Sequence, residues 1–371
     1  MSNLTKWLAI VIIVILIILG VWYYGSKSTV PAETGTIKIG AILPLTGKNA
    51  DWGEKVKRGI DQAQLEVGTS SLNILYEDMG DSLDKAVMAA NKFVSIDKVQ
   101  VLFCETSDSC SAISPIAQAN KTVLIGFTST PGFTEGGDFI FSVRGESPAA
   151  GKKIAEFAIK HYQTAVVFYL NNATQKGSYE AFAKTFPALG GQILLAEGHT
   201  DKDADFRTLL TRAKSLNPQV LVFMSRVTNA VNLVKQTREL GLNQPILAGL
   251  GIDTAGFIKG LGSSAEGITY PAATVQPDPT DGARLATLEN YKTKYNETMP
   301  VWTAESYDIT KLLDSLARLG KTDSATIRES LAATKNFPGL ASNSNFDEKR
   351  TIVKEYYLFT IKNGQFAPLE Q

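Results

Sequence analysis

Hydroxyl and carboxylate side chains follow an apolar run at residues 99–104 (VQVLFC), where the sequence changes to a helical pattern. Ser107 and Asp108 stand at this junction. The first N–H groups of a helix have no partner within it and carry partial positive charge, so the junction is suited to hold an anion. The alternative to an anion site is a purely structural role, in which Ser107 or Asp108 simply caps the helix.

A second apolar run, at residues 122–127 (TVLIGF), ends in the same way, with Thr128, Ser129 and Thr130. The carboxyl ends of neighbouring parallel strands face one crevice. Hydroxyls from both ends would hold a carboxylate there without leaving a buried charge unpaired. Turns are rich in Ser and Thr for local reasons too, so it is the pair of strand ends that indicates an anion site.

Runs rich in branched residues alternate with helical patterns from Thr36 onward, which predicts βαβ units and a parallel sheet. The alternation restarts after Ser147-Pro148, where proline suits the first turn of a helix. Residues 268–282, rich in Pro, Asp and Thr, interrupt it again. We therefore predict an α/β chain with two similar lobes and a crossing between them in this segment.

The composition excludes several classes of protein. The 371 residues are 44% hydrophobic and 20% charged, as in a globular protein with room for two cores. Lys plus Arg and Asp plus Glu both number 37, so there is no net basic charge to attract nucleic acid. The chain has no GxSxG, P-loop or helix-opening GxGxxG motif, and its two histidines, His161 and His199, lack metal-ligand spacing. We expect no enzymatic activity, no cofactor and no metal.

Residues 7–24 (WLAIVIIVILIILGVWYY) carry no charge and are long enough to cross a bilayer as one N-terminal hydrophobic helix. Such a segment is a signal anchor or a signal peptide, and the length of the apolar run favours the uncleaved anchor. Residues 26–35 then form a polar tether, so residues 1–35 stand apart from the folded lobes. Either alternative places the rest of the chain outside the cytoplasm.

Cys104 and Cys110 are the only cysteines in the sequence. An exported location permits a disulfide between them if the loop after the strand turns tightly. The alternative is a pair of small buried thiols.

The order and spacing of several segments resemble the type I periplasmic binding proteins, specifically the branched-chain amino-acid (Leu/Ile/Val) binding receptors of ABC transporters. The segments that carry the resemblance, from Thr36 to Phe366, include IKIGAILPLTGKNADWGEKVKRGIDQA, VLFCETSDSCSAISPIAQAN, VLIGFTSTPGFT, AVVFYLNNATQKGSYEAF and FDEKR. The resemblance implies two Rossmann-like lobes with parallel sheets, joined by three hinge crossings. Lobe 1 would comprise residues 36–146 and 275–339, and lobe 2 residues 147–274 and 340–371.

The same resemblance implies where the ligand binds. In such receptors, the loops that match Ser107 and Ser129-Thr130 hold the α-carboxylate of an amino acid through hydroxyls and backbone N–H groups. Trp52 matches an aromatic position that helps to wall the side-chain pocket, although it would equally suit an apolar position at the start of a helix. The second lobe supplies the lid.

Three positions in the second lobe depart from the family pattern. Thr174 and Arg226 stand where relatives often carry aromatic residues, and Leu250 stands where an acid should receive the ligand's ammonium. Asp253 stands three residues further on. If its carboxylate cannot reach the ligand's ammonium, an α-amino acid is a poor ligand, because burying the unpaired ammonium is costly. Arg226 would then favour a second anionic group or an amide-like oxygen, unless it is simply a surface residue at a helix start.

These features together predict a membrane-tethered extracytoplasmic receptor, monomeric, that closes on an amino acid or a small amide-like or carboxylate ligand. It would present this ligand to an ABC permease in the membrane. The alternative function is a sensor whose closed form signals to a membrane partner, and an enzyme is less favoured than either.

Overall fold

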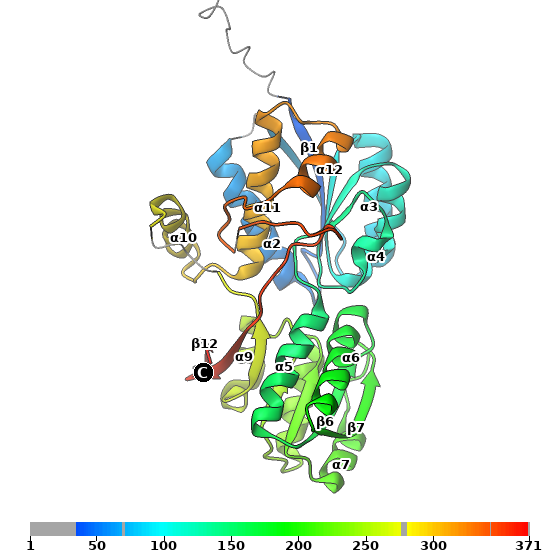
Figure 1. Cartoon of the computed structure of the whole chain (residues 1–371), viewed down its shortest axis with the longest axis vertical. Coiled ribbons are helices and arrows are strands. Elements are labelled where there is room, and N and C mark those ends of the chain that lie inside the picture. Colours follow the sequence, from blue (N-terminus) through cyan, green and yellow to red (C-terminus); the bar gives the residue numbers. More distant parts are fainter. Residues whose placement is uncertain (1–34, 69–70, 276–279, 342, 370–371) are drawn as a thin grey trace, which may run out of the picture.

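The computed structural model describes residues 35–68, 71–275, 280–341 and 343–369. The chain forms two α/β lobes that lie end to end and meet at a narrow waist (Figure 1). The hydrophobic helix expected at residues 7–24 lies outside the described residues. Within the described part of the chain, no helix is long and apolar enough to cross a membrane.

Lobe 1 is built on a five-stranded, fully parallel sheet with the order β2-β1-β3-β4-β5. The strands are β1 (Ile37–Leu43), β2 (Leu72–Asp78), β3 (Val101–Glu105), β4 (Val123–Phe127) and β5 (Ile140–Ser142). The helices are α2 (Ala50–Val67), α3 (Leu83–Lys92), η1 (Phe93–Asp97), α4 (Ser107–Ala119), η2 (Phe133–Gly136), α10 (Gly282–Tyr295), α11 (Val301–Arg318) and α12 (Ser324–Ala333).

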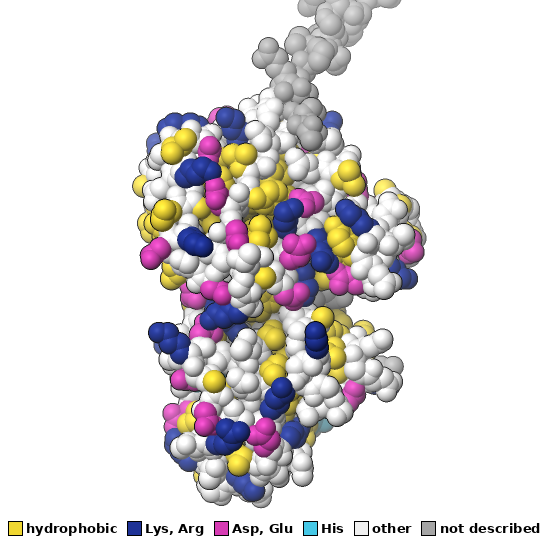
Figure 2. Space-filling view, turned by 180° about the vertical axis from the view of Figure 1, so that it is seen from behind, with side chains coloured by type: hydrophobic (Ala, Val, Ile, Leu, Met, Phe, Trp, Pro, Cys, Tyr) yellow, Lys and Arg dark blue, Asp and Glu magenta, His cyan; other side chains and the backbone are white. Residues whose placement is uncertain are grey.

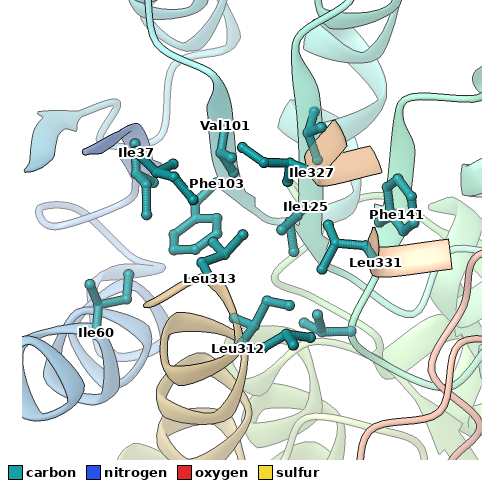
Figure 3. Close-up of a cluster of buried hydrophobic side chains, with 14 of the residues drawn as sticks. Ile37, Ile60, Val101, Phe103, Ile125, Phe141, Leu312, Leu313, Ile327 and Leu331 are labelled. Atoms are coloured by element: carbon teal, nitrogen blue, oxygen red, sulfur yellow. The ribbon is translucent and has the colours of Figure 1, made fainter. Parts of the chain in front are cut away.

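Helices cover both faces of this sheet, and the side chains of β3 alternate between them. Val101 and Phe103 belong to the core cluster formed with α2, α11 and α12, whereas Leu102 belongs to the cluster formed with α3 and α4. Figure 3 shows Phe103 beside Leu313 of α11 in the first of these clusters. Because both faces are buried, the strands are continuous apolar runs. This packing holds the carboxyl ends of β3 and β4 firmly in place.

Lobe 2 is built on a seven-stranded sheet with the order β12-β11-β10-β9-β8-β6-β7. The strands are β6 (Thr164–Leu170), β7 (Gln192–His199), β8 (Val220–Met224), β9 (Ile246–Ala248), β10 (Thr269–Ala272), β11 (Tyr357–Lys362) and β12 (Gln365–Pro368). The helices are α5 (Ser147–His161), α6 (Ala173–Ala188), α7 (Arg207–Leu216), α8 (Val227–Glu239), α9 (Ala255–Leu261) and η3 (Gly262–Ala265). The last two strands pair antiparallel, so this sheet is parallel only from β7 to β10.

The predicted two-lobed α/β fold is confirmed, and the chain crosses between the lobes three times. The third crossing lies later than the predicted boundary at residue 340. Phe346 and Ile352 pack in the core of lobe 1, and Thr351 pairs with Ser142 of β5, so the chain enters lobe 2 only as it approaches β11. The segment makes only isolated bridges, and for this reason it shows no periodic pattern in the sequence.

Candidate ligand site between the lobes

A tight turn at Thr106 joins the end of β3 to the start of α4. Thr106 has a φ of 72°, a left-handed conformation that is unfavourable for a residue with a side chain. Its hydroxyl accepts a hydrogen bond from the Ser109 N–H at 3.3 Å and caps the helix. The cap is therefore Thr106, and the alternative that Ser107 or Asp108 caps this helix is wrong. Residues on both sides of the turn, Glu105 and Ser107, line one cavity.

Of the two alternatives for Cys104 and Cys110, the structure has the disulfide, with the two Cα atoms 5.4 Å apart. The disulfide links the end of β3 to the first turn of α4, and Thr106 lies between the two cysteines in the sequence. Both cysteines are fully buried in the core cluster against α3. The disulfide therefore braces the loop that carries Ser107.

The two strand ends singled out in the sequence come together, and lobe 2 joins them. The Ser107 hydroxyl lies 2.6 Å from that of Thr174, at the start of α6, and 3.3 Å from that of Thr128. Thr130 completes the group, 2.8 Å from Thr128 and 3.4 Å from Thr174 between hydroxyl oxygens. We call these four residues the hydroxyl cluster. Its hydroxyls bond to one another across the cleft, in an enclosed position beside the first turn of α4.

Two adjoining cavities, of about 40 and 60 Å³, lie between the lobes at this point. Ser129, Arg144, Leu250, Gly251 and Trp302 line both of them. The larger also contacts Trp52, Glu105, Thr106, Ser107, Phe127, Thr128, Asn172, Thr174, Gln175 and Arg226. The predicted residue Asp253 lines the smaller cavity, beside Leu250. Both lobes thus contribute to one small enclosed site.

Buried charges that the sequence did not indicate form one wall of the site. Arg144 donates from Nε to Glu305 at 2.9 Å and from Nη1 to the Phe127 carbonyl at 2.8 Å, and Nη1 lies 3.8 Å from Glu105. Lys354 lies 3.8 Å from Glu305. Burial raises the pKa of the Glu105 carboxyl to about 7, and the nearby Arg144 offsets only part of this effect. We call Glu105, Arg144, Glu305 and Lys354 the charged wall.

Only one member of the charged wall could have been found from the sequence. Glu105 is visible as a carboxylate that ends a buried strand. Arg144 and Glu305 are 161 residues apart, and no local pattern connects them.

Two stacked tryptophans also line the site. The rings of Trp52, in the first turn of α2, and Trp302, at the start of α11, are stacked with centroids 6.0 Å apart. The guanidinium carbon of Arg144 lies 3.1 Å from the centroid of the Trp302 ring, as in a cation–π contact. Trp52 therefore lines the larger cavity, and Trp302 is a partner that the sequence did not reveal.

Arg226, in lobe 2, pairs with one carboxylate in each lobe. Its Nη2 lies 3.1 Å from Asp108 of lobe 1, and its Nη1 lies 2.7 Å from Asp201 of lobe 2. Both terminal nitrogens thus face carboxylates of the protein, which differs from the expectation that Arg226 would face an anionic group of the ligand. Figure 2 shows acidic and basic side chains gathered along the junction of the lobes. Arg226 contributes to the contact that holds the lobes together.

We expect Arg226→Ala to favour the open form of the ligand-free protein by about 1 kcal/mol, the scale of a partly exposed ion pair. The measurement is the distance between spin labels on cysteines that replace Met88 and Leu216, which are exposed on α3 and α7. Arg212→Ala is the control, because Arg212 pairs with Glu197 within lobe 2 at 2.7 Å. An unchanged distance distribution in Arg226→Ala would contradict the role of this ion pair.

No group of three or more His, Cys, Asp or Glu residues suited to a metal ion occurs in the described part of the chain. The site therefore consists of hydroxyls, buried charges and two aromatic rings. Such an arrangement can hold a small polar molecule between two lobes.

The chain is similar along its length to known binding proteins. A family model described as "Periplasmic binding protein" matches residues 36–365. The Leu/Ile/Val-binding protein BraC3 of Rhizobium johnstonii is 27% identical over 365 residues, which cover 93% of this chain and 97% of the relative. The leucine-, isoleucine-, valine-, threonine-, and alanine-binding protein of Pseudomonas aeruginosa is 26% identical over 332 residues, covering 85% of this chain and 86% of the relative.

A solved structure supports the same relationship. The crystal structure of the leucine binding protein LivK from Thermotoga maritima has a TM-score of 0.84 and 29% identity, and the match covers 90% of this chain and 98% of that chain. Its likeness extends over both lobes, because nine-tenths of the chain is covered. The protein belongs to the type I periplasmic binding proteins, in the branched-chain amino-acid-binding family of ABC transporter receptors, a family that acts outside the cytoplasm.

Proposed function

We propose that the protein is the solute-binding receptor of an ABC transporter, and that it binds an amino acid or a small carboxylate or amide-like ligand between its lobes. The observation that carries this proposal is the hydroxyl cluster, in which two strand ends of lobe 1 meet Thr174 of lobe 2 and of which Ser107, Thr128 and Thr174 line the larger cavity. A ligand carboxylate would replace the bonds that these hydroxyls make to one another. It would also accept from the unpaired N–H groups in the first turn of α4.

The receptor would work by a shift between open and closed forms, with no bond made or broken. A ligand that contacts both lobes favours the closed form by its difference in affinity for the two forms. Ser107 and Thr130 would grip the carboxylate from lobe 1, and Thr174 would complete the enclosure from lobe 2. Asp253, which lines the smaller cavity, is the proposed partner for a ligand ammonium. The closed form would then be presented to the permease.

We expect Ser107→Ala and Thr130→Ala each to weaken binding by roughly 1.5 to 3 kcal/mol, because each removes a charge-assisted hydrogen bond to the carboxylate. A thermal-unfolding screen with amino acids, amides, ureas and dicarboxylates first identifies a ligand. Calorimetric titration of the full chain in detergent then measures the affinity of each variant for that ligand. In that screen, a ligand at a hundredfold its dissociation constant adds about 2.7 kcal/mol to stability. Ser215→Ala, on α7 away from the site, is the control. Unchanged affinity in both site variants would refute the proposed carboxylate site.

We also propose that residues 7–24 hold this receptor at the membrane as a monomer, so that the lobes stay close to the permease. The uncharged apolar length of that segment supports this arrangement.

A further inference from the structure

Four buried polar atoms that line the site have no hydrogen-bond partner among the described residues. Two are acceptors, Glu105 Oε2 and Gln175 Oε1, and two are donors, Arg144 Nη2 and Trp302 Nε1. Folded proteins pair nearly all such buried groups, and an unpaired one calls for a specific explanation. Four of them beside one cavity indicate that a ligand supplies the missing bonds.

The protein holds these atoms in place through the other atoms of the same side chains. Gln175 donates from Nε2 to the Leu250 carbonyl at 3.1 Å, which leaves its Oε1 as the unpaired atom. Arg144 is fixed by its bonds to Glu305 and to the Phe127 carbonyl, which leave Nη2 unpaired. Glu105, Arg144 and Gln175 expose only 2%, 6% and 4% of their surface, so these side chains have no ready access to bulk water.

We infer that Glu105, Arg144, Gln175 and Trp302 form a subsite for a carboxamide group, so that the ligand is a small carboxylate with a terminal amide. This inference rests on the proposed function. A carboxamide has two N–H donors on its nitrogen and two lone pairs on its oxygen, which match the two acceptors and two donors of the subsite. A carboxylate would offer only acceptors, an ammonium only donors, and an aliphatic side chain neither.

The charges around the subsite also favour a neutral group. The charged wall has two acidic and two basic residues linked by contacts of 2.9 to 3.8 Å, so it is electrically balanced without a ligand. A further charge on this end of the ligand would have no counter-charge of its own, whereas an aliphatic group would leave the four polar atoms unpaired. Glu105 is two residues from Ser107, so the amide and the carboxylate of a short ligand can be bound together.

The test is calorimetric titration of the full chain in detergent with five probes. L-glutamine and glutaramate, its counterpart without the α-amine, carry the carboxamide; L-glutamate, L-leucine and L-isoleucine do not. We expect at least one amide probe to bind tenfold or more tightly than L-glutamate and the two aliphatic amino acids. Glu105→Leu and Gln175→Met should each weaken the amide probe tenfold or more. Gln192→Met, at an exposed position of β7, should leave it unchanged.

Three results would overturn the inference. If L-leucine or L-isoleucine binds as tightly as the amides and Ser107→Ala weakens that binding, the receptor function stands and the amide subsite fails. If the amides bind but Glu105→Leu and Gln175→Met, both shown to be folded by circular dichroism, do not change their affinity, the subsite is elsewhere. If none of the probes or the screened carboxylates binds, the proposed function fails as well.

Discussion

Arg144→Met is expected to lower the free energy of unfolding of the ligand-free protein by about 3 to 5 kcal/mol, the usual cost of removing one partner from a buried ion pair. Arg144 exposes only 6% of its surface and lies between Glu105 and Glu305, both of which are also buried. Methionine fills much of the volume but leaves two carboxylates with less positive charge nearby. It also leaves the Phe127 carbonyl without its donor.

Urea denaturation at pH 8, followed by circular dichroism, measures this change. Arg207→Met is the matched control, because Arg207 pairs with Asp205 and Glu239 at 3.2 and 2.9 Å but is 53% exposed. Its loss is expected to cost less than about 1 kcal/mol, since exposed ion pairs contribute little. If Arg144→Met were no more destabilising than this control, the charged wall would not be a stabilising element.

The stability contributed by Glu105 is expected to fall by about 3 kcal/mol as the pH rises from 4.5 to 7. Burial raises the pKa of this carboxyl from 4.5 to about 7 in the folded protein, whereas the unfolded chain keeps the ordinary value. Between these two values the folded state holds a proton that the unfolded state has released, so raising the pH favours unfolding. Each unit of pKa difference is worth about 1.4 kcal/mol.

A comparison with Glu105→Gln isolates this effect, because other titrating groups are shared by the two proteins. The wild type should lose stability relative to the variant from pH 4.5 to 7, and the difference should stay constant above that range. Denaturation curves at pH 4.5, 5.5, 6.5, 7.5 and 8.5 provide the measurement. A difference that does not change with pH would show that Glu105 ionises at the same pH in both states.

The two predictions concern the same physical feature of the site. Glu105 lies where the charged wall, the hydroxyl cluster and the proposed carboxamide subsite meet. Its pKa is raised because burial removes the carboxyl from water, and the nearby arginines offset only part of that cost. A ligand N–H group that donates to Oε2 would therefore favour the ionised carboxylate and reduce this cost.

Local patterns in the sequence were enough to predict the elements and the strand ends that carry the site. The alternation of apolar runs and helical patterns indicates the two sheets, because burial on both faces requires such runs. The hydroxyls after β3 and β4 meet because both strands are parallel neighbours and end at the same edge of the sheet. The same turn brings Cys104 and Cys110 within reach of each other.

The amino-acid pattern alone is therefore enough to predict the two α/β lobes, the resemblance to a receptor family, and the position of the hydroxyls at two strand ends. Which charges face one another follows only from how the chain folds: Arg144 pairs with Glu305 across 161 residues, and Arg226 pairs with Asp108 across 118 residues. The difference arises because hydrophobic periodicity is a local pattern of neighbouring residues, and it indicates only which side chains are buried. The partner of a buried charge depends on how distant segments and the two lobes come together.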